Sequence, residues 1–545
     1  MSGFGSSVAG ANVAFWRIRC STRRVLPRVC LVVAEQHIEV NRTGLWVAVI
    51  TILGGVPRII GLGTTPLWLD ESYTGLCSRM MAADGWAAAT ACDHISPGYY
   101  VLAVISATLF GNFSETTMRL AAALAGLATI PAMAALARRM LNNDRAVVAV
   151  ALATALAPLL LRYSQEARGY SPLLLLTVCY LILNWDLVQR GPSLWRFAGI
   201  LGIATGMVWL HTAALYAMVA VGLLMVWQLK LTKRPIWVWA AVHLLAGLSY
   251  LPFALATSDD LARLVDNPLP GNPLPRLALN AMAMIAGSSL GPTAQDVGTM
   301  GTGAVIVANL PALGLIGVAV VCAVLAGWRL RNQVTSTVWV WLAVLLIVPN
   351  LLLVTSVYTS HVLLHVRYVI TTWPVYGLLV GLIWANIRRH ATALVAGLLL
   401  IAVCIASTVN YFVNPKYARE DVTRLPATLA ETMKADDVLL IANDNVVVPM
   451  LFYGLRCPAN TIDMRNEHAF ETLRTATAAP GGDTFVILYR QWENTPPEVL
   501  NEFLDQTLAP PSQVWRWQGV ELQRRPGRLL VGTGPGLDRG CLYDS

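Results

Sequence analysis

Charged residues are scarce in this chain. Asp, Glu, Lys and Arg make up 13% of its 545 residues, whereas 56% are hydrophobic and the mean hydropathy is +0.57. A soluble domain carries roughly 25% charged residues, so this chain has too few to cover a surface exposed to water. Lysine is especially rare, and arginine supplies most of the positive charge behind the net charge of +8. An ordinary soluble protein is therefore excluded.

The sequence also lacks the cysteine spacing of a metal site and the charge pattern of a nucleic-acid-binding surface. The nine cysteines lack the spacing of a metal site. Two pairs, Cys77 with Cys92 and Cys457 with Cys541, could form disulfides if their segments face an oxidising space, and free buried thiols are the alternative. The basic residues occur in short clusters between apolar runs, which is typical of cytoplasmic loops, so we expect no nucleic-acid partner.

Long apolar runs recur along most of the chain. A helix needs about 20 residues to cross the hydrocarbon core, and backbone groups in lipid must bond within their own segment. The pattern predicts an α-helical polytopic membrane protein with about 11–13 transmembrane helices. Eleven runs cover 43–62, 115–138, 146–162, 170–187, 196–210, 213–229, 236–256, 302–327, 335–358, 366–385 and 392–412. We interpret the shorter run 96–110 as an interfacial helix; the alternative is two further spans in the count.

The basic clusters predict the direction of the chain. The N-terminal segment 1–42 is rich in arginine, so we place it in the cytoplasm and read the first span as a retained signal anchor. Alternation then puts the turns "ARRMLNNDR", "QRGPSLWR", "KLTKR", "WRLRN" and "NIRRH" on the cytoplasmic side, where positive charge is favoured. The protein is expected to be multi-pass in the plasma membrane, with its unusual polar residues on the extracytoplasmic side.

The composition divides the chain into three parts. Residues 43–412 form the predicted transmembrane domain, with a first outer loop at 63–114. After residue 412, "DVLLIA" and "DTFVILYR" read as strands, "TPPEVLNEFLDQT" as a helix, and "GVELQRR" and "RLLVGT" as further strand candidates. We expect residues 413–545 to form a small extracytoplasmic α/β domain.

Two adjacent carboxylates, Asp70 and Glu71, follow the first apolar run. Acids against a membrane are costly and are functional candidates by default. The alternative is a helix C-terminus reaching water, but the helix dipole disfavours acids there. Neighbouring helical residues point roughly 100° apart, so the two acids should serve different partners. One can face a cavity and accept a proton while the other is held by a cation or a metal.

Four blocks occur in order along the chain: "PLWLDESYTG", "HISPGYYVLAVISATLFGNFSETTMRL", "RYSQEARGYSPLLLL" and "HVLLHVRYVITTWP". They resemble the membrane glycosyltransferases of the C fold (GT-C), above all the branch with protein O-mannosyltransferases and aminoarabinose transferases. The similarity is dense over 43–190, thin to about residue 340, and returns at 360–385. It departs from the family where Ser96 replaces the first proline of a His-Pro-Pro-type element.

The resemblance implies transfer of a sugar from a polyprenyl-phosphate carrier to an acceptor outside the cytoplasm. Asp70 matches the family's general base, and Glu71 matches the neighbouring acid, which orients the site or binds a divalent cation where one is used. Arg168 is our first choice for the cation that stabilises the leaving phosphate, and Arg367 is the second; snorkelling at the interface is the alternative for Arg367.

Other polar residues complete the candidate substrate-binding set. The resemblance implies that His94 hydrogen-bonds the donor or acceptor, and Glu166 is expected to pair with Arg168 or another cation. His211 and Tyr368 are further candidates at the cavity. Two further histidines, His361 and His365, stand four residues apart, which would suit a metal, but no acid stands beside them on the same helix, so no metal site is predicted. Solvated or interfacial positions are the alternative for each histidine and for Glu166.

Mannose is the expected sugar, carried on a polyprenyl phosphate. The Arg-, Ala- and Val-rich composition suggests an actinobacterial envelope, where the acceptor would be a lipoglycan such as lipoarabinomannan, or a protein. Arabinose or aminoarabinose transfer is the first alternative. A polytopic transporter or flippase of lipid-linked sugars is the second, although transporters place charges near the midplane and show related halves. A membrane scaffold with a polymer-binding domain is the third.

Overall fold

The computed structural model describes residues 27–92, 95–231, 236–257, 273–360, 364–455, 458, 460–464, 473–490, 497–531 and 537–539. The described part of residues 46–545 forms one compact unit. The described helices up to residue 257 are α1 (Pro27–Ile59), α2 (Leu69–Asp84), α3 (Trp86–Cys92), α4 (Gly98–Phe110), α5 (Glu115–Leu141), α6 (Asp144–Leu156), α7 (Pro158–Ser164), α8 (Tyr170–Arg190), α9 (Leu194–Leu210), α10 (Ala214–Leu231) and α11 (Trp237–Ala256).

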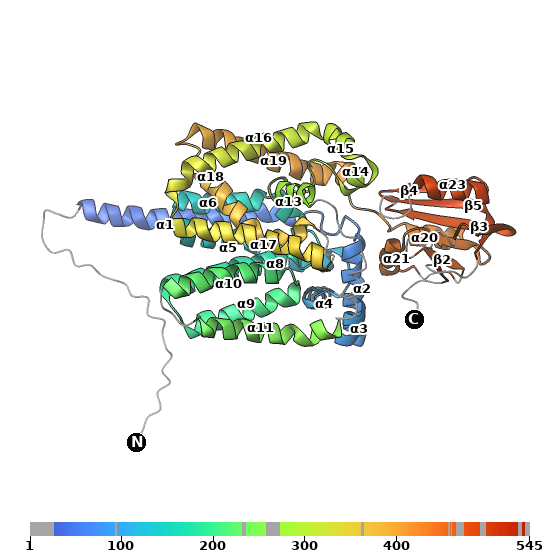
Figure 1. Cartoon of the computed structure of the whole chain (residues 1–545), viewed down its shortest axis with the longest axis horizontal. Coiled ribbons are helices and arrows are strands. Elements are labelled where there is room, and N and C mark those ends of the chain that lie inside the picture. Colours follow the sequence, from blue (N-terminus) through green and yellow to red (C-terminus); the bar gives the residue numbers. More distant parts are fainter. Residues whose placement is uncertain are drawn as a thin grey trace, which may run out of the picture. The chain divides into compact units, whose positions relative to one another are not determined.

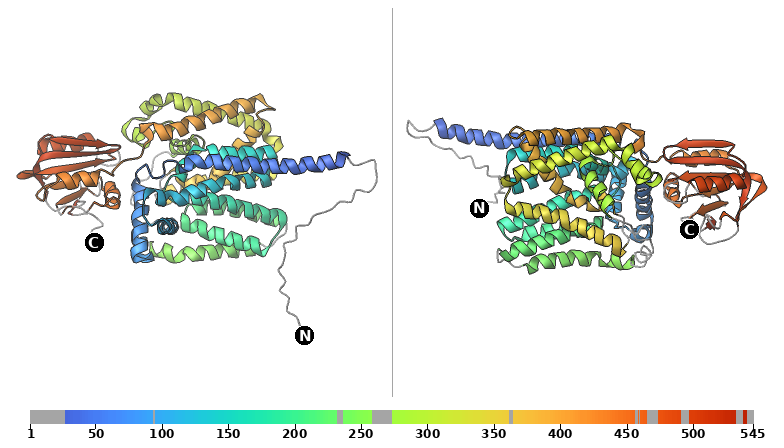
Figure 2. Two further views of the ribbon diagram at one scale, coloured as in Figure 1. Left: turned by 180° about the vertical axis from the view of Figure 1, so that it is seen from behind. Right: turned by 45° about the horizontal axis from the view of Figure 1, so that its top comes forward.

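The second part of the helical region follows a segment outside the described residues. Its helices are α13 (Leu274–Ala286), α14 (Ala294–Thr299), α15 (Thr302–Ala308), α16 (Leu310–Leu330), η2 (Arg331–Gln333), α17 (Ser336–Ser360), η3 (Val366–Thr372), α18 (Trp373–Ala385) and α19 (Ala391–Val413). Figure 1 shows the long helices of the bundle running side by side, with α2 and α3 lying across them at one end. The two further views in Figure 2 show the same arrangement.

The predicted helical membrane fold is confirmed. Among the described residues, seven helices are long and apolar enough to cross a membrane, and the pair α6–α7, bent by 57°, would make an eighth. Each of the eleven predicted runs is helical over most of its length. The run 96–110 forms the 13-residue helix α4, which is too short to span a bilayer of about 30 Å.

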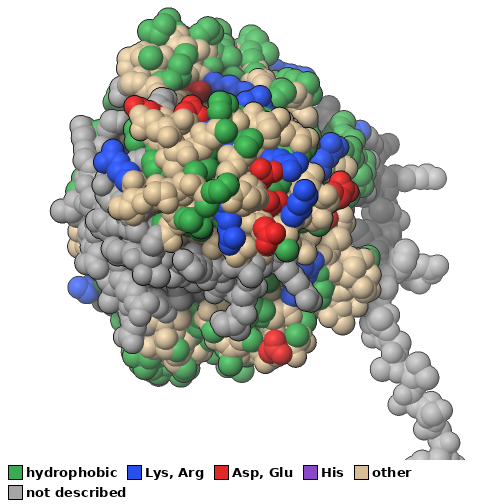
Figure 3. Space-filling view, turned by 90° about the vertical axis from the view of Figure 1, so that its right-hand side faces the viewer, with side chains coloured by type: hydrophobic (Ala, Val, Ile, Leu, Met, Phe, Trp, Pro, Cys, Tyr) green, Lys and Arg blue, Asp and Glu red, His purple; other side chains and the backbone are tan. Residues whose placement is uncertain are grey.

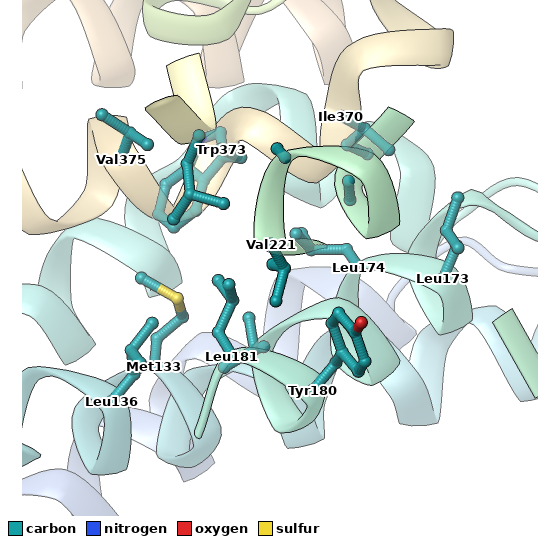
Figure 4. Packing of buried hydrophobic residues seen from close by; sticks show 14 of the residues in the cluster. Met133, Leu136, Leu173, Leu174, Tyr180, Leu181, Val221, Ile370, Trp373 and Val375 are labelled. Carbon is teal, nitrogen blue, oxygen red and sulfur yellow. The ribbon is translucent and has the colours of Figure 1, made fainter. Parts of the chain in front are cut away.

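A continuous apolar core joins several helices of the bundle. Figure 4 shows side chains of α5, α8, α10, η3 and α18 meeting in this core, among them Met133, Leu181 and Val221. Ile370 of η3 and Trp373 of α18 are almost fully buried in it. Close packing of this kind fixes the short η3 segment, and with it the residues just before Ile370.

The residues after the bundle build an α/β region. Its helices are η4 (Pro415–Tyr417), α20 (Leu425–Thr432), η5 (Asp444–Val446), α21 (Val447–Phe452) and α23 (Pro497–Thr507). Its strands are β1 (Val438–Ile441), β2 (Thr461–Met464), β3 (Thr477–Tyr489), β4 (Gln513–Trp517), β5 (Val520–Leu530) and β6 (Leu537–Arg539). The predicted small C-terminal α/β fold is confirmed.

The six strands form one sheet in the order β4-β5-β3-β1-β2-β6. β1 pairs in parallel with β2 and β3, and all four of its residues are buried, as expected for a central parallel strand. The two strand candidates "GVELQRR" and "RLLVGT" both contribute to a strand, and they form one element, because β5 runs through both. Pro526 and Gly527 lie inside it, where the β3 partner has a register shift near Asp483, and an irregular ladder tolerates a proline.

The face shown in Figure 3 carries charge of both signs. Lys and Arg side chains alternate there with Asp and Glu side chains, and the hydrophobic side chains are scattered between them. A surface of mixed charge is typical of a region in contact with water. This contrasts with the bundle, where large apolar side chains such as Leu109, Trp195 and Val307 are exposed along the helices.

Candidate functional site

Asp70 and Glu71 lie in the first turn of α2, not at the end of the preceding span. A helix C-terminus reaching water, the alternative considered for these acids, is therefore wrong. The first turn has free backbone N–H groups and the positive end of the helix dipole, which favour carboxylates. Gly85 ends the helix with a positive φ of 87°, a conformation that glycine adopts without strain.

The Asp70 carboxylate faces two arginines. Arg367 Nη1 donates a hydrogen bond of 2.6 Å to Asp70 Oδ2, and Arg168 Nη2 lies 4.0 Å from Asp70 Oδ1. The side chain of Asp70 is 19% exposed, that of Arg367 18% and that of Arg168 7%. The three predicted residues therefore meet in one place that is largely shielded from water but still reachable.

The Glu71 carboxylate has different partners and is completely buried. Arg119 donates to both of its oxygens, from Nε and Nη2, each at 2.7 Å. Arg419 donates from Nη1 to the same oxygen, Oε2, that Arg119 Nη2 contacts, and the backbone N–H of Ala167 donates to Oε1 at 2.7 Å. Adjacent acids thus serve separate neighbours, as the helical geometry predicted.

Arg119 anchors the segment that leads into α2. Its Nη1 donates to the carbonyl oxygens of Leu62 and Thr65, and its Nη2 donates to that of Pro66, at 2.7 to 2.8 Å. The guanidinium is fully buried, and Glu71 supplies the compensating charge. The start of α2 is therefore tied to α5 by one ion pair and three backbone contacts.

The charges around these acids shift the pKa of each carboxyl differently. Burial alone would raise the pKa of Glu71, but Arg119, Arg419 and their hydrogen bonds prevail and lower it to about 2. Glu166 is also buried, and desolvation raises its pKa although Arg419 and Arg162 act in the opposite direction. Glu71 is thus held ionised, whereas burial favours the neutral form of Glu166.

Glu166 and Arg168 belong to a short bent segment between α7 and α8. Glu166 Oε2 lies 4.0 Å from Arg419 Nη2, so Glu166 pairs with a cation other than Arg168, one of the two predicted outcomes. The segment passes very close to the end of α9: a Cβ on Gly169 would stand 2.8 Å from the carbonyl oxygen of Leu210. Glycine is required for this approach, which sets the position of Arg168.

Arg367, Tyr368 and His211 form the other side of the site. Arg367 Nη2 donates to the hydroxyl of Tyr368 at 3.1 Å, and the Tyr368 ring lies 5.5 Å from the His211 ring. His211 Nδ1 accepts from the backbone N–H of Ala213 at 3.0 Å. Burial, with Arg367 and Arg168 nearby, lowers the pKa of His211 to about 3, so this ring is neutral. His365 Nδ1 accepts from the backbone N–H of Arg367 at 3.2 Å.

His94, His361 and both members of the possible Cys457–Cys541 pair lie outside the described residues. Among the residues that the structure describes, no group of three or more His, Cys, Asp or Glu side chains could hold a metal ion. Asp70 and Glu71 both face guanidinium groups, whose positive charge opposes a divalent cation at the same oxygens. The donor set therefore does not fit the divalent cation that the resemblance allowed near these acids.

Three arginines of the cluster were missed in the sequence. Arg119 lies one turn into the long apolar helix α5 and is fully buried, and the cost of burying a charge there was a usable signal. Arg162, in α7, donates to Ser288 Oγ at 2.7 Å. Arg419 follows the last helix of the bundle, and nothing local in the sequence relates it to Glu71. Arginines outnumber carboxylates at the site, which favours an anionic ligand.

The fold is that of solved membrane glycosyltransferases. The chain superposes on ArnT from Cupriavidus metallidurans with a TM-score of 0.53 and 13% identity, covering 88% of this chain and 97% of that one. It also superposes on the oligosaccharyltransferase of Archaeoglobus fulgidus with a TM-score of 0.51 and 13% identity, covering 82% and 70% of the two chains. The predicted GT-C fold is therefore confirmed.

The sequence adds a family match. Residues 94–253 match the model of the dolichyl-phosphate-mannose-protein mannosyltransferases. This region includes Glu166, Arg168 and His211. No curated protein sequence matches the chain. The family match and the shared fold support a membrane glycosyltransferase of GT-C type, the class to which the four sequence blocks pointed.

Proposed function

We propose that the protein transfers a sugar from a polyprenyl-phosphate carrier to an acceptor hydroxyl. The observation that carries the proposal is the position of Asp70, a carboxylate within reach of two arginines in a shielded but accessible site. A base and a phosphate-binding cation side by side are what this reaction needs, because the acceptor must lose a proton while the phosphate leaves.

Asp70 is the general base in this mechanism. It accepts the proton of the acceptor hydroxyl as that oxygen forms a bond to the anomeric carbon of the sugar. The bond between the anomeric carbon and the phosphate oxygen breaks, and the carrier phosphate leaves with the electron pair. Attack from the side opposite the phosphate inverts the anomeric centre. A positioned base contributes about 10²–10⁴-fold to such a step.

Arg367 and Arg168 stabilise the phosphate. A guanidinium can hold a phosphate with two parallel hydrogen bonds, which are stronger than neutral ones. In the structure Arg367 donates to Asp70. When the donor binds, the phosphate draws Arg367 toward itself, and the Asp70 oxygen then becomes available to the acceptor hydroxyl. His211 and Tyr368, which line the arginine side of the site, contact the sugar or phosphate in this proposal, with His94 and Glu166 as further substrate-binding residues.

Mannose is the proposed sugar, and the proposed acceptor is an envelope lipoglycan or a protein. The name of the matched family supports both a polyprenyl-type phosphate carrier and mannose. Asp70 would serve any sugar hydroxyl acceptor equally, so specificity must come from residues around it.

The extracytoplasmic side of the plasma membrane is the proposed location of the site. The distribution of positive charge supports this location, because basic turns are favoured on the cytoplasmic side of a membrane. A disulfide joins Cys77 in α2 to Cys92 in α3, next to the site, and disulfides persist in oxidising compartments. Residues 1–42 are then cytoplasmic, 43–412 form the transferase domain and 413–545 lie outside.

Reconstitution of the purified chain tests the proposal. Liposomes containing the protein are supplied with polyprenyl phosphates carrying labelled mannose, arabinose or aminoarabinose, together with an envelope lipid extract or a secreted protein as acceptor. We expect the mannose donor to be consumed and free polyprenyl phosphate to be released. Consumption of another donor alone would replace mannose, and consumption of none, with properly folded protein, would contradict the transferase.

A further inference from the structure

The α/β region contacts the helix that carries Asp70. Phe452, the last residue of α21, lies on α2 at Gly75, where an added Cβ would stand 2.4 Å from the Phe452 ring. Arg79, one turn further along α2, stacks its guanidinium 4.0 Å from the centre of the same ring and donates to the Phe452 carbonyl at 2.7 Å. On α2, Gly75 thus leaves room for the Phe452 ring, and Arg79 makes a cation–π contact with the same ring.

The neighbouring tyrosine holds the start of α2. The Tyr453 hydroxyl accepts from the backbone N–H of Leu67 at 2.8 Å and donates to Glu115 Oε1 at 3.0 Å. Leu67 stands two residues before α2, and Glu115 opens α5. One hydroxyl therefore links the α/β region, the approach to α2 and the beginning of α5.

Arg419 makes the third contact, directly to the acidic pair. It lies between α19 and α20, and its side chain is only 8% exposed. Nη1 donates to Glu71 Oε2, and Nη2 donates to the carbonyl oxygen of Gln165 at 3.0 Å. Gln165 and Glu166 precede Arg168 in the same bent segment. Arg419 therefore joins the two elements that carry Asp70 and Arg168.

We infer that Arg419 is a positioning residue and that the docked α/β region sets the geometry of the catalytic pair. This rests on the proposed transferase function of Asp70. Because Asp70 and Glu71 are adjacent on one rigid turn, a shift of Glu71 also moves Asp70. The segment 165–168 moves with Arg419 in the same way. The α/β region then acts on the rate of transfer, besides any contact that it makes with the acceptor.

A positioning role of Arg419 predicts a larger effect on the chemical step than on donor binding. Arg168 and Arg367 contact the phosphate in the proposed mechanism, whereas Arg419 is engaged by Glu71 and Gln165. Loss of Arg419 should therefore lower kcat more than it raises the KM for the lipid-linked donor, because Arg367, the phosphate cation on η3, has no contact with Arg419 and keeps its place. A displacement of about 1 Å at a reacting group can cost about 100-fold in rate.

The test compares Arg419→Gln, Arg419→Lys and Arg516→Gln in the full-length chain. Arg516 also belongs to the α/β region and pairs with an acid, Glu521, but its side chain is 72% exposed. For Arg419→Gln we expect kcat to fall 10- to 100-fold with the donor KM within threefold of wild type. Arg419→Lys should recover part of the loss, because it restores the charge, and Arg516→Gln should behave as wild type.

A second measurement does not depend on activity. Hydrogen exchange of residues 67–76 and 165–168 should become faster in Arg419→Gln than in Arg516→Gln, since the contact that links the two segments is lost. Unchanged exchange and unchanged kcat in a folded Arg419→Gln protein would overturn the inference. Faster exchange in a protein that consumes no donor in any form, wild type included, would instead contradict the proposed function and leave the coupling in place.

Discussion

Arg367 and Asp70 are 297 positions apart in the chain and are joined by a hydrogen bond of 2.6 Å. The pair brings η3, which rests on the apolar core of the bundle, against the first turn of α2. Arg168 approaches the other oxygen of the same carboxylate at 4.0 Å. The protein thus holds its candidate base between two cations supplied by different elements.

Replacing Asp70 by Asn should abolish transfer without unfolding the protein. The amide oxygen can still accept from Arg367, but an amide cannot take up the acceptor proton. We expect the rate to fall by about 10²–10⁴-fold. Initial rates of donor consumption in proteoliposomes measure the effect. Asp144→Asn is the matched control, since Asp144 also pairs with an arginine, Arg138, at an exposed position. Transfer at the wild-type rate by Asp70→Asn would remove Asp70 from its role.

Replacing Arg367 by Gln should weaken binding of the carrier phosphate and slow transfer. A hydrogen bond to a charged group contributes about 1.5–3 kcal/mol, which corresponds to roughly 10- to 150-fold in affinity. Polyprenyl phosphate binding to the purified variant, measured by calorimetry or by competition, reports the loss separately from the rate.

Arg168→Gln should show the same defect, because Arg168 faces the same carboxylate. The exposed Arg138→Gln serves as the control for removing one positive charge. Wild-type affinity for polyprenyl phosphate in both Arg367→Gln and Arg168→Gln would show that the phosphate binds elsewhere.

The sequence predicted the local features of the site better than its long-range contacts. Asp70, Arg168 and Arg367 were found because each is a charge near the end of an apolar run, where burial is costly. The pairing of Arg419 with Glu71 could not be found in this way, because it depends on where the α/β region docks. The same limit applies to Tyr453, which contacts Leu67 across a separation of 386 residues.

The elements of the fold were likewise predicted where a local apolar pattern marks them and missed where none does. Apolar runs of about 20 residues identified the helices of the bundle, and buried strands such as β1 were recognised by their continuous apolar residues. The short helices α13 and α14 were missed, because they lie in a segment read only as an outer loop. The α2 helix was missed as an element too, since its first turn is polar and its periodicity is weak.

The ion pair of Glu71 should make stability depend on pH in the acidic range. The pKa of Glu71 is about 2 in the folded protein, compared with an ordinary value of 4.5. A lowered folded pKa contributes stability that is present above pH 4.5 and is lost as the pH falls toward 2. A shift of this size corresponds to about 3 kcal/mol. Thermal unfolding in detergent at pH 7, 5, 4 and 3 measures it.

The Glu71→Gln variant isolates this contribution. It leaves Arg119 and Arg419 buried without their counter-charge, so it should be less stable than wild type by about 3–5 kcal/mol at pH 7. Its stability should vary less between pH 5 and pH 3 than that of wild type. Glu431→Gln, a change at an exposed helix position, is the control. Parallel curves for wild type and Glu71→Gln would show that Glu71 is not the group that titrates.

The disulfide between Cys77 and Cys92 should stabilise α2 and α3 and, through α2, the site. It joins α2 to α3 across 15 positions of sequence, and both cysteines are buried. Closing a loop of this length stabilises a fold by about 3 kcal/mol in the chain-entropy model. We expect reductant to lower the unfolding temperature of the wild type and to slow transfer, because α2 also carries Asp70.

The double variant Cys77→Ser/Cys92→Ser separates this bond from other effects of the reductant. It should start from the lower stability and lose nothing further when reductant is added, whereas Cys179→Ser, which changes a free cysteine, should respond as wild type does. Alkylation of the denatured, unreduced protein followed by peptide mass analysis detects the bond itself. If Cys77 and Cys92 are both alkylated in protein purified without reductant, the two cysteines are free thiols, and the disulfide no longer supports an oxidising location for α2.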